Sequence, residues 1–214
     1  MTEVIAREVR DVDPAVVAAG PPVIPNLAGR FRLRLVDPDG DDPTMLADWF
    51  ARPHLVQTWD QPWSAETWAA DTRTRLAGDY SRPLVVSHDG RDVAYLELYR
   101  VARDEIARLY RTDPYDTGLH IATADTSLLG RGVMSGFMGD LVEAVFADEP
   151  RCRRVVAEPA AENTRMRRAL VKQGFVELGD FQIRPDRRIT LCVRGRSPLD
   201  VPEPHPVSEI ANPG

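Results

Sequence analysis

A histidine and a glycine-bearing turn lie close together in the segment GLHIATADTSLLGRGVMSGFM, residues 118–138. Its first part is strand-like, and its second part has the apolar spacing of a helix. A turn of this kind at a helix N-terminus offers unpaired backbone N–H groups and the positive end of the helix dipole to a phosphate. By itself the turn is more typical of an ordinary strand-to-helix connection. The candidate pyrophosphate site comprises Arg131, Gly132, Val133, Met134 and Ser135.

His120 can exchange a proton near neutral pH. On a strand it shares one face with Gly118 and Ala122, whose small side chains leave space beside the imidazole. The alternative is a core histidine with satisfied hydrogen bonds. His120 is therefore a candidate general base.

Aromatic and acidic residues suit a ligand with an aliphatic stem and a cationic end, because rings pack on the stem and a carboxylate holds the cation. Core packing or a simple turn is the alternative for each of them. The candidates for this second site are Asp60, Trp63, Glu97 and Tyr99, within a wider set that adds Trp59, Asp113, Tyr115 and Asp116.

The composition limits the function classes. A formal charge of −6 provides no global case for nucleic-acid binding. Lys172 is the only lysine, so we attribute the many arginines to coding composition and discount arginine clusters as anion sites. No apolar run approaches the roughly 20 residues that span a bilayer, and the charged N-terminus does not resemble a signal peptide. A cytoplasmic protein without a membrane partner is expected.

The two cysteines, Cys152 and Cys192, lie in apolar strand-like stretches. Neither has the Cys or His spacing of a zinc site. Both are predicted to be buried thiols, and no metal is expected.

Proline-rich ends flank a single domain. Proline lacks the N–H that helix and sheet interiors need, so residues 1–26 are predicted to form an irregular N-terminal arm and residues 197–214 a Pro-rich tail. The folded domain is then residues 27–196.

Within the domain, the periodicity predicts the order βααβββαβαββ. Residues 30–36 alternate like a strand, Asp42 is expected to cap a first helix, and Ser64 precedes a second. Asp89-Gly90 marks a hairpin. Later elements follow as strands at 118–125, 153–158, 175–178 and 188–193, and as helices at 133–147 and 163–173. A mixed α/β fold with an antiparallel first half follows.

A second motif makes the turn at 130–132 more informative. Asn163 begins a helix that ends at Gly174-Phe175, about thirty residues after the turn with one strand between. The turn and this helix together resemble motifs of the GNAT N-acyltransferase superfamily. The resemblance implies the GNAT acyl-CoA N-acyltransferase fold, a mixed central sheet flanked by helices, with acyl-CoA as co-substrate and Asn163 among the residues that bind it.

The sequence also departs from the GNAT pattern. Leu129 replaces the usual Gln or Arg, and Met134 replaces a small residue. Leu170 stands where many of these enzymes have a tyrosine that protonates the departing thiolate. The usual general acid is therefore missing.

A narrower resemblance covers Arg52 to Phe175 and is to the siderophore-biosynthesis branch, which includes lysine, N-hydroxylysine and N-hydroxycadaverine acyltransferases. It rests on RPHLVQTWDQPW, YLELYRVARDEIARLY, DPYDTGLHIATAD, FADEPRCRRVV and the Asn163 helix. It implies a catalytic histidine at His120 and a catalytic acidic residue at Glu158. The implied reaction acylates the side-chain amine or hydroxylamine of lysine or a related diamine, with His120 and Glu158 removing the acceptor's proton.

Two alternatives remain open: an aminoglycoside N-acetyltransferase and a noncatalytic acyl-CoA-binding protein. The sequence leaves undetermined the acyl length, the choice among lysine, ornithine and cadaverine, the N-hydroxylation of the acceptor, and whether the protein is a monomer or a homodimer.

Overall fold

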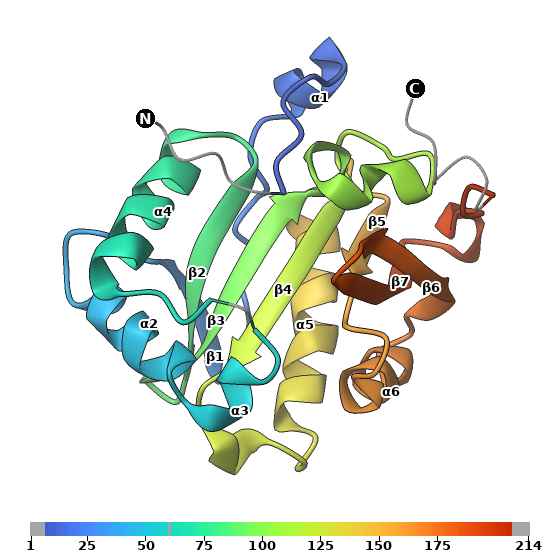
Figure 1. The fold of residues 1–214 in the computed structure, drawn as a ribbon. Helices are drawn as coiled ribbons and strands as arrows, with labels where there is room; N and C mark the ends of the chain where they lie inside the picture. Colours follow the sequence, from blue (N-terminus) through green and yellow to red (C-terminus); the bar gives the residue numbers. More distant parts are fainter. Residues whose placement is uncertain (1–6, 60, 207–214) are drawn as a thin grey trace.

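A seven-stranded mixed sheet forms the centre of the computed structural model, which describes residues 7–59 and 61–206 (Figure 1). The strand order is β1-β2-β3-β4-β5-β7-β6. Neighbouring strands are antiparallel except β4 and β5, which are parallel. The strands are β1 (Phe31–Leu35), β2 (Ser81–His88), β3 (Arg91–Arg100), β4 (Thr117–Thr123), β5 (Arg154–Ala157), β6 (Val176–Arg184) and β7 (Arg187–Gly195).

Helices cover both faces of this sheet. The α-helices are α1 (Pro14–Ala19), α2 (Asp42–Phe50), α3 (Pro53–Val56), α4 (Ala65–Ala77), α5 (Val133–Asp148) and α6 (Thr164–Lys172). The 3₁₀ helices are η1 (Val101–Arg103), η2 (Glu105–Leu109), η3 (Thr126–Leu128) and η4 (Pro198–Asp200). The predicted mixed α/β fold is confirmed, and so is the predicted order of the main helices and strands.

Side-chain alternation along β3 divides the core between the two faces. Leu96 and Leu98 pack in the cluster that includes α5. Tyr95 packs on the opposite face, with Phe50 of α2 and Trp68 of α4. Because strand side chains alternate between faces, Glu97 and Tyr99 point to the same side as Tyr95.

Several local expectations need correction. Asp42 is not the cap of α2 but its first residue, and its carboxylate instead accepts hydrogen bonds from Arg34 and from the backbone N–H of Asp37. Strand β6 is longer than the predicted 175–178, because it pairs along its length with β7 in a hairpin. Helix α3 and the two 3₁₀ helices after β3 had no clear periodic signal.

The described residues at both ends of the chain include helical segments. Residues 14–19 form α1 within the segment expected to be irregular, since Pro14 lies in the first turn, where its missing N–H costs nothing. The tail beyond β7 contains η4, and the part of the tail from residue 207 to residue 214 lies outside the described residues. No helix in the described ranges is long and apolar enough to cross a membrane.

Both cysteines are buried and unpaired, as predicted. Burial raises the pKa of the Cys152 thiol to about 11, so neither its position nor its ionisation suits a nucleophile.

Candidate active site

Strands β4 and β5 separate where the candidate catalytic residues lie. In the described part of the chain, their ladder comprises only Thr117–Val155 and Gly118–Val156. His120 lies two residues further along β4, and Glu158 follows the last residue of β5. Beyond Gly118 the edge of β4 that faces β5 is therefore available to a ligand, with His120 and Glu158 at the start of the gap.

His120 contacts a carboxylate on each side of its ring. Its Nε2 contacts Oε1 of Glu158, and its Nδ1 lies 3.5 Å from Oε2 of Glu97. Glu97 is placed there by register, since it is directly opposite His120 on β3. An ionised carboxylate can only accept a hydrogen bond, so Glu158 and Glu97 each favour a hydrogen on the ring nitrogen that faces them.

Tyr99 fixes the plane of the imidazole. Its ring stacks on His120 with centroids 4.6 Å apart, and its hydroxyl donates to Oε2 of Glu158 at 2.5 Å. Gly118 lies opposite Tyr99 on β4, and a Cβ at that position would be 2.1 Å from the tyrosine ring. The space that the small residue leaves beside His120 is therefore filled by Tyr99.

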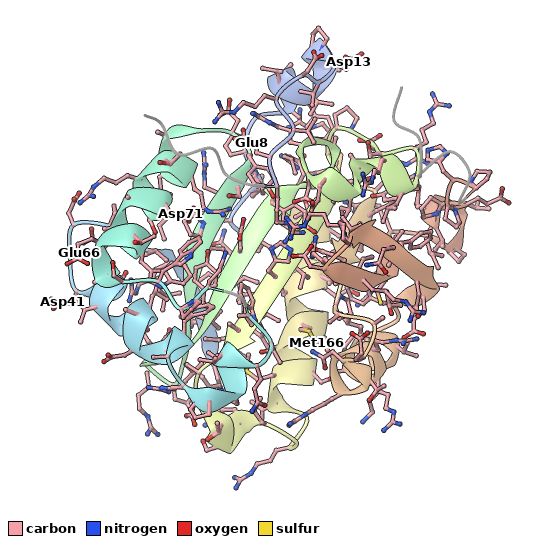
Figure 2. All side chains as sticks on the ribbon, viewed as in Figure 1. Glu8, Asp13, Asp41, Glu66, Asp71 and Met166 are labelled. Atoms are coloured by element: carbon pink, nitrogen blue, oxygen red, sulfur yellow. The ribbon has the colours of Figure 1, made fainter. Side chains whose placement is uncertain are left out.

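Arginines compensate the buried carboxylates. Arg75 of α4 donates to Glu97 and, at 2.6 Å, to Asp71, which also belongs to α4 and is labelled in Figure 2. Glu158 contacts Arg7 and lies 3.1 Å from Arg187 of β7. The Glu158 side chain has no solvent exposure, so these contacts replace its hydration.

The charges set the ionisation of the three groups. Burial opposes the charged form of Glu97, but Arg75 and His120 lower its pKa to about 2. Burial likewise opposes ionisation of Glu158, yet His120 and Arg7 hold its pKa well below the usual range. Burial disfavours a charged His120, but the Glu158 carboxylate outweighs this and raises the pKa of His120 above 6.5. The arrangement is a histidine between two ionised carboxylates.

A cavity of about 1730 Å³ connects this centre to both predicted binding regions. On one side it is lined by Trp59 and Trp63, and on the other by Gly132 and the α6 residue Met166 (Figure 2). His120 and Glu158 lie along the same cavity. A ligand on the α5 side and a ligand on the tryptophan side would therefore meet at His120.

The turn before α5 has the backbone shape of an anion site. Gly130 and Gly132 have φ values of 76° and 79°, in the left-handed region that favours glycine, and Gly132 is the cap of α5. Met134 and Ser135 line the cavity, whereas Arg131 is exposed and Val133 is not part of the lining. The predicted residues are thus only partly brought together.

Two of the predicted binding residues have structural partners. Ser135 accepts a hydrogen bond from Gln173 at 3.1 Å, which joins α5 to α6. The Asn163 side chain accepts from the backbone N–H of Met166 at 3.1 Å and caps α6. Both residues still line the cavity.

Of the predicted acceptor residues, Trp63, Glu97 and Tyr99 are near His120 or line the same cavity. Asp60 lies outside the described residues. Asp116, from the wider set, is buried elsewhere and accepts from the Tyr110 hydroxyl at 3.0 Å. Leu170 is buried, lines the cavity and supplies no proton.

The residues missed from the sequence are arginines. Arg7 and Arg187 contact Glu158, Arg75 contacts Glu97, and Arg165 of α6 brings its guanidinium beside Gly130. Discounting the arginines as coding composition removed the signal that could have found them. In the described residues, no group of three or more His, Cys, Asp or Glu side chains is arranged to hold a metal ion.

Comparisons with known proteins identify the family of the chain. The family model for the "Acetyltransferase (GNAT) domain" matches residues 38–183. The chain is 41% identical over 199 residues to the lysine N-acyltransferase MbtK of Mycobacterium sp. (strain MCS), covering 93% of this chain and 81% of that protein. It is 27% identical to the N(6)-hydroxylysine O-acetyltransferase of Escherichia coli, over 80% of this chain and 54% of that one. A solved structure of the aminoglycoside acetyltransferase AAC(6')-Ib with coenzyme A superposes with a TM-score of 0.66 at 25% identity, covering 78% of this chain and 95% of the other.

Proposed function

The chain belongs to the GNAT acetyltransferase family and is an acyl-CoA N-acyltransferase, and we propose that it acylates the side-chain nitrogen of lysine or a related amine or hydroxylamine during siderophore assembly. The observation that carries the proposal is the position of His120, between Glu97 and Glu158 at the point where β4 and β5 part. The similarity to relatives named for lysine and hydroxylysine supports the acceptor class.

The acceptor binds on the tryptophan side. Its ammonium lies beside Oε2 of Glu97 and Nδ1 of His120, which are 3.5 Å apart and can both bind one nitrogen, and its aliphatic stem packs against Trp59 and Trp63. Asp60 belongs to the same proposed site. An alkyl ammonium has a pKa of about 10.4, so it must lose a proton before it can attack.

His120 accepts that proton at Nδ1, and Glu158 holds the Nε2–H side of the ring. The nitrogen lone pair then attacks the thioester carbon and the carbon–sulfur bond breaks, so that coenzyme A departs as a thiolate. The nitrogen gives up its second proton as the amide forms, the thiolate takes up a proton to become the thiol, and His120 releases the first proton to solvent. No covalent enzyme intermediate is needed, and both cysteines are buried.

Acyl-CoA binds on the α5 side. Backbone N–H groups at the start of α5, with Gly132 at its cap, hold the pyrophosphate, and Arg131 and Arg165 add positive charge. Val133, Met134, Ser135 and Asn163 complete the proposed site. Backbone N–H groups on the free edge of β4 polarise the thioester carbonyl.

The test is release of the CoA thiol by purified protein. Acetyl, succinyl, medium-chain and long-chain donors are each paired with lysine, N6-hydroxylysine, N-hydroxycadaverine, N5-hydroxyornithine and kanamycin. Turnover on one of the first four acceptors supports the proposal and defines the donor length. Turnover on kanamycin alone identifies an aminoglycoside acetyltransferase, and acyl-CoA binding without any turnover identifies a binding protein.

A cytoplasmic location, a monomeric or homodimeric state and independence from metal remain predictions. Size-exclusion chromatography with light scattering and activity after chelator treatment test the last two.

A further inference from the structure

The N-terminal arm reaches the catalytic centre through its backbone. Residues 7–10 run beside the turn between η1 and η2: the N–H of Val9 donates to Arg103 O at 2.8 Å, and the N–H of Glu105 donates to Arg7 O at 3.0 Å. Glu8, labelled in Figure 2, pairs with Arg103 at 2.6 Å. These contacts fix the direction of the Arg7 side chain.

The guanidinium of Arg7 lies among the groups that surround the catalytic histidine. Its Nη2 contacts Oε1 of Glu158 and lies 3.4 Å from Oδ1 of Asp104. Its Nη1 lies 2.8 Å from Nε2 of His120. Its Nε lies 3.4 Å from a carboxylate oxygen of Glu105. Arg7 therefore joins three carboxylates at one edge of the imidazole.

The other groups facing His120 come from four elements. They are Glu97 and Tyr99 of β3, Glu158 after β5, Asp104 before η2 and Arg187 of β7, with Arg75 of α4 behind Glu97. Asp104 and Glu158 are both fully buried and repel each other. Without Arg7, this edge of the site would hold buried negative charge that attracts a proton to His120.

We infer that Arg7 is a positioning residue of the active site, which holds Glu158 against Nε2 of His120 and offsets the negative charge around the imidazole, so that the ring can lose its proton and accept that of the acceptor. The inference rests on the proposed function only in giving His120 the role of base. It makes the N-terminal arm part of the catalytic centre, although the sequence placed these residues outside the folded domain.

An alternative role for Arg7 is that of a plug, a side chain that occupies the acceptor site and blocks it. Its side chain is a cation on an aliphatic stem and lies beside the base. Its position favours the positioning role. It lies at the Nε2 edge with Glu158, whereas the proposed acceptor site lies at the Nδ1 edge with Glu97. Backbone hydrogen bonds on both sides of Glu8 also hold the arm in place.

The first test follows the His120 imidazole by NMR through a pH titration of the full chain without substrates. The chain has four histidines, so the spectrum of His120→Gln assigns the signal. Arg7→Gln should raise the His120 midpoint by about one pH unit, because a like charge is removed. Arg7→Lys should restore much of the wild-type value. Arg10→Gln, on the same arm but paired only with Glu8 among the contacts described, should leave it unchanged.

The second test measures kcat and KM for the acceptor across pH. Arg7→Gln should move the acid limb of kcat/KM upward by the same amount and lower kcat about tenfold at neutral pH. An unshifted His120 midpoint would overturn the inference, and a lower acceptor KM with undiminished kcat would identify a plug. If Arg7→Gln does not fold, Arg7→Met is measured in its place, because methionine keeps an aliphatic stem and removes the charge. Because the NMR titration needs no turnover, it tests Arg7 even if the proposed reaction fails.

Discussion

The two sides of the cavity are built in opposite ways. On the acceptor side, Glu97, Glu158 and Arg75 are buried, and each is held by at least two charged or hydrogen-bonding partners. On the donor side, the turn before α5 consists of two glycines in left-handed conformations, and Arg131 and Arg165 beside it are exposed. One side relies on side-chain networks, and the other relies on backbone shape and exposed arginines.

This difference predicts which substitutions change the rate of the reaction and which change ligand binding. A buried charge network has one arrangement of low energy, so losing a member changes the chemistry. When backbone N–H groups and exposed arginines bind a phosphate, the binding free energy is the sum of many small contributions. Substitutions on the acceptor side should therefore affect kcat or acceptor binding strongly, and those on the donor side should affect acyl-CoA binding weakly.

The largest effect is expected for His120→Gln. Removing the base should lower kcat/KM about 10²–10⁴-fold, while acyl-CoA binding measured by calorimetry stays within about twofold. His88→Gln, at the end of β2 and away from the cavity, is the matched control. A loss shared by both variants would assign the effect to folding.

Glu97→Gln comes next. Without the ionised carboxylate, the KM for a cationic acceptor should rise about 10–100-fold, with little change in the KM for acyl-CoA. The variant also tests stability against pH. The pKa of Glu97 is lowered to about 2. The ionised carboxylate therefore contributes to the free energy of unfolding above its ordinary pKa near 4.5, and this contribution is lost as the pH falls toward 2. An acceptor KM equal to that of the wild type would remove Glu97 from the acceptor site.

Gly118→Ala tests the packing that orients the imidazole. The new Cβ would overlap the Tyr99 ring, so the free energy of unfolding should fall by about 1–3 kcal/mol in urea denaturation, with a lower kcat. Gly136→Ala on α5 has open space around it and should be neutral or stabilising by up to about 1 kcal/mol. Equal stability of the two variants would show that Tyr99 is free to move.

The smallest effect is expected on the donor side. Arg165→Ala should raise the KM for acyl-CoA about twofold to fivefold and leave kcat unchanged, because the guanidinium is exposed. Arg30→Ala, an exposed arginine of the β1–β2 region, is the control. A large fall in kcat for Arg165→Ala would contradict the division between the two sides.

The sequence predicted what local patterns determine. Alternation gave β1 and the β2–β3 hairpin, and the Asn163 side chain caps α6 where the predicted helix begins. His120 was a candidate from its place on the strand and Glu158 from the resemblance to the siderophore branch, and the structure places these two side chains in contact. The register of β3 against β4, which sets Glu97 opposite His120, depends on strand pairing that no single segment specifies.

Long-range ion pairs could not be predicted from the sequence. Arg7 and Glu158 are separated by 151 positions, and nothing in either segment marks the other as its partner. The arginine-rich composition concealed Arg75 and Arg187 among many exposed arginines. Asn163 differs from these arginines, because the sequence singled it out as a residue that binds acyl-CoA. In the structure its side chain also caps α6.

The most direct test of the account is the pH dependence of kcat/KM between about pH 5.5 and 9, with the preferred acceptor, for the wild type and His120→Gln. If His120 accepts the acceptor's proton, the wild-type value should rise about tenfold per pH unit while the imidazole is charged, and level off above the raised pKa of His120. His120→Gln should lose that break. An identical break in both proteins would show that another group is the base and would contradict the account.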